Sequence, residues 1–139
     1  MIPVVGINSS SAPFMRDIGL LLKRLETRNK DMLGSLVGQR VILAETKQGG
    51  YIAMYTAVIR SGREIRSSEE WDSLRTLHCV PSGNKYDWQP GTRVKWVYEI
   101  TDLRRLRPFR VPDGVRHGRV WMEYNPPRTS KKTKGGCLK

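Results

Sequence analysis

The stretch LLLKRLETRNKDMLGSLVGQRVILAET, residues 20–46, contains the pattern that decides the fold of this chain. The apolar residues that lead into it recur at intervals of three and four residues, and this spacing predicts a helix to about Leu22. Residues 24–29, RLETRN, alternate large and polar side chains, as a short strand does. After a loop at residues 30–36, residues 39–46, QRVILAET, are apolar in the middle, which is typical of a buried strand.

Further strands are expected on both sides of this stretch. Residues 3–7, PVVGI, predict a first strand, and residues 51–60, YIAMYTAVIR, predict a strand that follows a glycine-rich hairpin turn. Ser61 and Gly62 are expected to end that strand. Residues 94–100, VKWVYEI, are rich in aromatic and β-branched side chains and form the strongest predicted strand. Residues 118–124, GRVWMEY, predict the last one.

One more helix and a basic tail complete the expected organisation. Ser67 and Glu70 have the S-x-x-E spacing of a capping box, which predicts a short second helix. Residues 103–112 alternate basic and apolar side chains, and their prolines favour an extended segment over a helix. We therefore expect one domain over residues 1–125 and a flexible basic tail over residues 126–139, which have little to bury.

The charge of the chain is strongly positive. It has 25 Lys and Arg against 13 Asp and Glu, a formal charge of +12. Eleven of those cations and three acids lie in residues 101–139, so about +8 is concentrated there. This excess favours a polyanionic partner, although a solvated surface and a disordered tail also account for such a run.

Cysteine and histidine usage points to no metal, disulfide framework or cofactor. Cys79 and Cys137 are far apart, and His78 and His117 have no spacing that suits a metal or a catalytic set. Residues 1–14 lack the pattern of a signal peptide, and no apolar run reaches the roughly 18 residues of a membrane-spanning helix. We expect a cytoplasmic protein without a membrane partner.

Residues 20–46 resemble the signature region of ASCH domains, which belong to the PUA-like group. The recurring pattern of that region is G-x-K-x-x-E-x-R, followed by a loop, a glycine and a buried strand. Lys23, Glu26 and Arg28 match three of its four fixed positions. Leu21 stands where the family usually has glycine, which predicts a different backbone approach at that point.

The resemblance extends over about residues 3–124 and includes the segment VKWVYEITDLRRLRPFRVP, residues 94–112. It implies an α+β fold, a small PUA-like β-barrel of five or six strands with two or three short helices, in which the signature residues line a cleft. It also implies RNA binding. A few small relatives act on modified nucleosides or cut RNA.

The signature side chains have the chemistry of a polar binding site. Alternation along the strand places Glu26 and Arg28 on one side, where Lys23 meets them from the end of the helix. Lysine and arginine bind phosphate, and the carboxylate accepts hydrogen bonds from a base or a ribose. The alternative is a purely structural role, in which these residues form an ion pair that fastens the helix to the sheet.

Two further groups of side chains complete the predicted site. Tyr86 and Trp88, in a loop rich in glycine and proline, are candidates for stacking on a base. A basic strip is the candidate for contacts with the nucleic-acid backbone. It consists of Arg104, Arg105, Arg107, Arg110, Arg116 and Arg119.

Three functions remain open from these residues. The first is a module that binds RNA or a modified nucleotide. The second is a small hydrolase, of the ribonuclease or N4-acetylcytidine amidohydrolase type, with Lys23 and Glu26 as catalytic groups. The deacetylating relatives carry threonine where this chain has Glu26, which argues against that transfer. The third is a non-catalytic protein-interaction domain.

Overall fold

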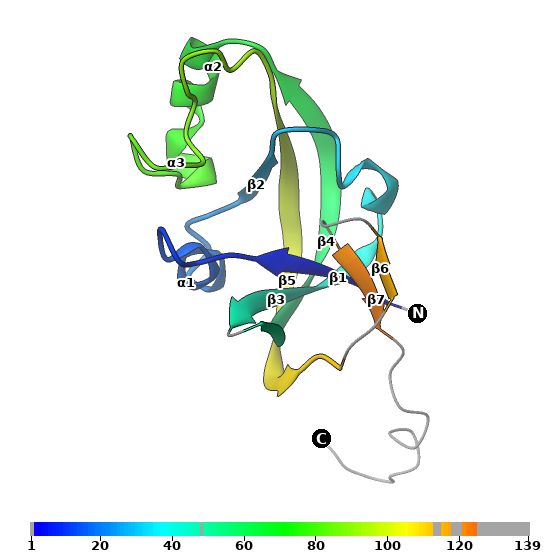
Figure 1. The fold of residues 1–139 in the computed structure, drawn as a ribbon. Helices are drawn as coiled ribbons and strands as arrows, with labels where there is room; N and C mark the ends of the chain where they lie inside the picture. The colour runs from blue at the N-terminus through cyan, green and yellow to red at the C-terminus, as the bar shows by residue number, and fades with distance from the viewer. Residues whose placement is uncertain (1, 48, 113–114, 118–120, 125–139) are drawn as a thin grey trace, which may run out of the picture.

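The computed structural model describes residues 2–47, 49–112, 115–117 and 121–124 (Figure 1). These residues form seven strands, three short α-helices and one 3-10 helix. The strands are β1 (Ile2–Ile7), β2 (Leu25–Arg28), β3 (Arg40–Lys47), β4 (Gly50–Ile65), β5 (Lys95–Arg110), β6 (Val115–His117) and β7 (Trp121–Tyr124). The helices are α1 (Phe14–Gly19), α2 (Ser68–Ser73), α3 (Arg75–His78) and the 3-10 helix η1 (Gly34–Leu36). The predicted tail, residues 126–139, lies outside the described residues.

The strands form one mixed sheet in the order β2-β5-β4-β3-β1-β7-β6. Only the pairing of β1 with β3 is parallel among the described strands. The sheet curls into a half-barrel, so that the edge strand β2 comes to face β1 (Figure 1). The expected α+β barrel fold is confirmed. The sheet has seven strands where five or six were expected, because the C-terminal segment forms the short strand β6 as well as β7.

The long ribbon of β4 and β5 corrects two predicted strand ends. Ser61 does not end β4, because it adopts a φ of 54° within a bulge, and the ladder resumes at Arg63. β5 continues through Pro108 to Arg110. The β4–β5 ladder shifts register between Arg105 and Phe109, so Pro108 lies in an irregular stretch, where proline is tolerated.

The first helix ends earlier than its apolar pattern predicted, at Gly19. Leu21 adopts a left-handed φ of 61°, and its N–H donates to the carbonyl of Ile18 at 3.0 Å. The N–H of Leu22 donates to the carbonyl of Asp17 at 2.8 Å. These two bonds form a Schellman motif, in which glycine is usual at the position of Leu21. Leucine in place of glycine therefore does not prevent this turn.

Leu21→Gly is expected to raise the free energy of unfolding by about 1 kcal/mol, since a left-handed non-glycine residue carries roughly that cost. The side chain of Leu21 is largely exposed, so little burial is lost. Leu22→Gly is the matched control, because Leu22 is also exposed but has a negative φ. It should destabilise by roughly 0.5–1 kcal/mol through backbone entropy. Urea unfolding of both variants measures the difference. A loss of stability in Leu21→Gly would contradict the expected strain.

The main core lies on one face of the sheet, where α1 and α2 contribute buried side chains. Phe14 and Ile18 of α1 and Trp71 of α2 are buried there. The hydroxyl of Ser67 accepts the N–H of Glu70 at 3.1 Å, so the predicted N-cap of the second helix is confirmed. None of the helices in the described ranges is long and apolar enough to cross a membrane.

Candidate functional site

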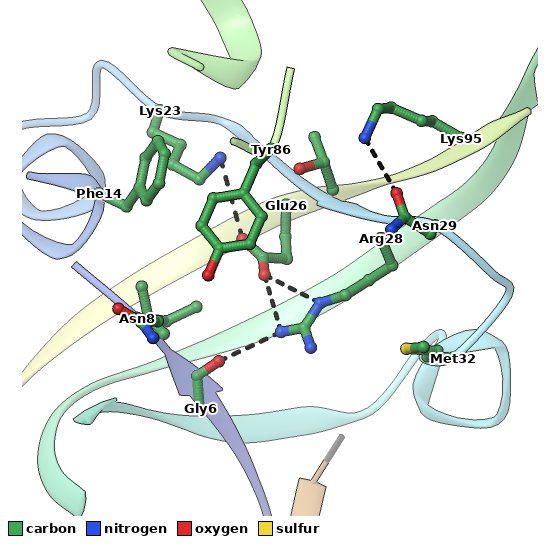
Figure 2. A pocket seen from close by; sticks show the side chains of 12 residues that line it. Gly6, Asn8, Phe14, Lys23, Glu26, Arg28, Asn29, Met32, Tyr86 and Lys95 are labelled. Atoms are coloured by element: carbon green, nitrogen blue, oxygen red, sulfur yellow. Dashed lines mark hydrogen bonds and ion pairs between the residues drawn. The ribbon is translucent and has the colours of Figure 1, made fainter. Parts of the chain in front are cut away.

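A cavity of about 200 Å³ lies where β1, β2 and the start of α1 meet the loop before β5 (Figure 2). It is smaller than the roughly 300–1,000 Å³ of sites for drug-sized ligands, so it suits one small group. Its lining consists of Gly6, Ile7, Asn8, Phe14, Lys23, Glu26, Thr27, Arg28, Asn29, Met32, Tyr86 and Lys95.

Glu26 and Arg28 lie side by side in this cavity, as the strand alternation predicted (Figure 2). Arg28 approaches Oε2 of Glu26 with Nε at 3.0 Å and Nη2 at 2.7 Å. Its Nη2 also donates to the carbonyl of Gly6 at 3.2 Å, so this side chain links β2 to β1 across the opening of the half-barrel. Arg28 thus uses one oxygen of the carboxylate and leaves the other to the rest of the cavity.

Lys23 completes the predicted cluster from the end of α1. Its side chain is 2% exposed, and its Nζ lies 3.8 Å from Oε1 of Glu26. The same Nζ donates to the carbonyl of His78 at 2.7 Å and lies 4.9 Å from the centroid of the Phe14 ring. Burial lowers the pKa of Lys23, although the negative charge of Glu26 opposes this shift. The three matched residues therefore share one site, with both cations partly balanced by a single carboxylate.

His78 forms part of the wall that holds Lys23. Its ring is fully buried and stacks on Trp71 with centroids 4.0 Å apart. Nδ1 accepts the N–H of Val80 at 2.9 Å, so Nε2 carries the proton and donates to the carbonyl of Trp71 at 3.0 Å. Burial lowers the pKa of His78 to about 4, so the ring is neutral near pH 7.

Lys95 and Asn29 belong to the cavity, although neither was among the predicted site residues. Lys95 is 5% exposed, and its Nζ donates to Oδ1 of Asn29 at 2.9 Å. It also lies 5.0 Å from the centroid of the Trp71 ring. Burial lowers the pKa of Lys95, with Asp87 opposing the shift. The sequence offered one signal for Lys95, namely its place within a predicted strand rich in aromatic residues, VKWVYEI.

The two predicted stacking residues separate in the structure. Tyr86 lines the cavity and meets Phe14 edge to face, with centroids 6.1 Å apart. Trp88 does not line it. Its ring is half-buried and packs 6.3 Å from Trp71 at the border of the core, and its stacking on a base stays a prediction.

Four arginines of the predicted basic strip are exposed on β5. Arg104 pairs with Asp102 at 3.3 Å, whereas the side chains of Arg105, Arg107 and Arg110 form no ion pair or hydrogen bond with any described residue. The side chain of Arg116 and the whole of Arg119 lie outside the described part of the chain. Of the strip's described side chains, those without a partner therefore lie in the C-terminal half of β5.

Neither a protein-family model nor a curated protein matches this sequence. Solved structures do share its fold. The ASCH protein of Zymomonas mobilis matches with a TM-score of 0.62 and 17% identity, over 76% of this chain and 71% of that one. A serine-to-alanine variant of the Zymomonas mobilis protein matches with a TM-score of 0.68 and 14% identity, over 94% of this chain and 92% of that one. At such identities the likeness shows the fold alone.

Proposed function

We propose that this chain, which has the ASCH fold, is a module that binds RNA or a modified nucleotide. In this proposal the cavity holds one nucleotide and the arginines of β5 hold the backbone of the strand. The observation that carries it is the cluster of Lys23, Glu26 and Arg28 inside a cavity of the size of one small group. Burying charged side chains is costly, so their presence around a cavity favours a ligand site over a protein-interaction domain whose charge serves only solubility.

The cavity offers a hydrogen-bond donor and an acceptor side by side. Oε1 of Glu26 and Nζ of Lys23 are 3.8 Å apart, which is too long for a hydrogen bond between them. Both atoms therefore keep capacity for a ligand. Every nucleobase carries neighbouring donors and acceptors on its edge, and an unstacked base is commonly held by such contacts together with an aromatic ring. Tyr86 and Phe14 supply the rings.

The exposed strip on β5 suits the phosphate backbone. Arg105, Arg107 and Arg110 are exposed and have no carboxylate partner among the described residues. Contacts of this kind fix a nucleic acid without reading its sequence, and each one releases a counterion. With a formal charge of +12, the chain also attracts polyanions over a distance.

Replacing Arg105, Arg107 and Arg110 by glutamine is expected to weaken binding to single-stranded RNA and to flatten its salt dependence. Three lost phosphate contacts correspond to a decrease of about 2 in the slope of log affinity against log salt. Fluorescence anisotropy with a labelled RNA of mixed sequence, at several salt concentrations, measures the slope.

The matched control removes the same charge from the other end of the ribbon, by replacing Arg60, Arg63 and Arg66 with glutamine. Arg63 and Arg66 are already paired with Glu70 and Glu64, and Arg60 contacts the hydroxyl of Thr101. The control should change the slope by less than the β5 variant. Equal slopes in both variants would reduce the role of β5 to net charge, and absence of RNA binding by the unaltered protein would refute the proposal.

A further inference from the structure

Lys95 and Asn29 form a second polar pair in the wall of the cavity. They lie on one side of it, whereas Lys23 and Phe14 lie on the other, with Glu26 and Tyr86 between them (Figure 2). The pair is held by the hydrogen bond of 2.9 Å from Nζ of Lys95 to Oδ1 of Asn29.

The charges are not balanced equally on the two sides. Lys23 and Arg28 share the carboxylate of Glu26. Lys95 forms no ion pair with any carboxylate in the described part of the chain, and its close neighbours are the neutral amide of Asn29 and the ring of Trp71. The negative charge of Asp87 acts on Lys95 only from beyond the 4 Å of an ion pair. A buried cation without a carboxylate in contact is costly, so a ligand that brings a negative charge to this side stabilises it.

The hydrogen-bonding capacity of the pair points to the same kind of ligand. The ammonium of Lys95 has three donors, of which one is used by Asn29. The amide nitrogen of Asn29 is free to donate to a ligand, and Oδ1, which accepts the bond from Lys95, keeps one lone pair. This side of the cavity thus presents donors and a positive charge, whereas the side of Lys23 and Glu26 presents a donor and an acceptor.

We propose that Lys95 and Asn29 form a phosphate subsite, so that the cavity selects a phosphorylated nucleotide over the corresponding nucleoside. The inference rests on the proposed function of the cavity and specifies its ligand. A phosphate group has only acceptor oxygens and a negative charge, which match the free donors of this pair. The base or sugar then lies against Glu26, Lys23 and Tyr86. Burial lowers the pKa of Lys95, and a bound phosphate supplies the counter-charge that opposes this shift.

The test compares ligands that differ only in the phosphate. The affinities of cytidine, uridine, adenosine and guanosine are measured by calorimetry against those of their 5′- and 3′-monophosphates and of dinucleotides joined by a phosphodiester. We expect at least one monophosphate or dinucleotide to bind tenfold or more tightly than its nucleoside. The position of the preferred phosphate separates a free nucleotide from a nucleotide within a strand.

Two variants assign this preference to the subsite. Lys95→Met keeps an unbranched chain and removes the charge, and Asn29→Asp supplies a carboxylate beside Lys95 that repels phosphate. Both should lower nucleotide affinity about tenfold or more and change nucleoside affinity less than about twofold, since one charge-assisted contact is lost. Lys30→Met is the control, because it removes an exposed lysine next to Asn29 that has no ion-pair partner among the described residues. It should leave the preference in place. Because Asn29 is exposed, Asn29→Asp tests the subsite even where Lys95→Met unfolds the protein.

The outcomes separate this inference from the proposed function. Equal affinity for nucleosides and their phosphorylated forms would overturn the phosphate subsite and leave the nucleotide cavity standing. A preference that survives both Lys95→Met and Asn29→Asp would also overturn the subsite. Failure of every nucleoside, nucleotide and dinucleotide to bind would overturn the proposed role of the cavity, and the subsite with it.

Discussion

Glu26→Gln is expected to lower the free energy of unfolding by about 3 kcal/mol, because it leaves two cations without their shared carboxylate. The side chains of Lys23 and Glu26 are 2% and 12% exposed, so solvent cannot replace the lost charge. Urea unfolding, monitored by tryptophan fluorescence, measures the change. Glu64→Gln is the matched control, since it breaks the exposed pair with Arg66 and should cost less than about 1 kcal/mol.

The same variant distinguishes a binding site from an ion pair that only fastens α1 to the sheet. If Glu26 contacts the ligand, Glu26→Gln should also weaken nucleotide binding about tenfold, which corresponds to about 1.4 kcal/mol. Affinity is measured without denaturant, at a temperature where the variant is fully folded. A large loss of stability with unchanged affinity for every RNA and nucleotide tested would reject the cluster as the ligand site.

A double-variant cycle assigns the energy to the pair itself. Lys23→Met combined with Glu26→Gln should cost less than the sum of the two single changes, because removing both partners leaves fewer unpaired buried charges. Strict additivity would show that Lys23 and Glu26 do not stabilise each other. The distance of 3.8 Å between their charged atoms favours coupling.

Acidification from pH 6.5 to pH 4 is expected to lower the free energy of unfolding by about 3 kcal/mol through His78, since each unit of pKa shift corresponds to about 1.36 kcal/mol. Burial lowers the pKa of His78 from 6.5 to about 4 in the folded protein. The unfolded chain therefore binds the proton first as the pH falls. The contribution of His78 is fully present above pH 6.5 and is lost by about pH 4.

Urea unfolding at intervals between pH 7 and pH 4 tests this expectation. His78→Gln should remove most of the slope, and His117→Gln, which replaces the other histidine of the chain, measures how much belongs to that residue. The ionisation of Asp87 contributes to the free energy of unfolding over a different pH range. Burial raises its pKa, but hydrogen bonds from the indole of Trp71, the N–H groups of Gly83 and Trp88 and the guanidinium of Arg75 lower it to about 2. Its contribution is therefore lost only below about pH 3.8. An unchanged slope in His78→Gln would contradict the role of the buried ring.

The sequence by itself determined the features that depend on near neighbours. The alternation of RLETRN predicted that Glu26 and Arg28 share a side, because successive side chains of a strand point to opposite faces. The S-x-x-E spacing predicted the cap at Ser67, because the bond joins residues three apart. The resemblance of residues 20–46 to ASCH domains predicted the fold that solved structures share with this chain.

Only the tertiary structure decided what depends on contacts between distant segments. Lys95 and Asn29 are 66 residues apart and meet because β2 pairs with β5. Trp88 packs on Trp71 because the loop before β5 folds back over α2, which no local pattern indicates. β4 continues past Ser61 because its partner β5 extends the ladder beyond the bulge. Local patterns encode which way a side chain points, whereas its neighbours are set by strand pairing and packing over long separations in the chain.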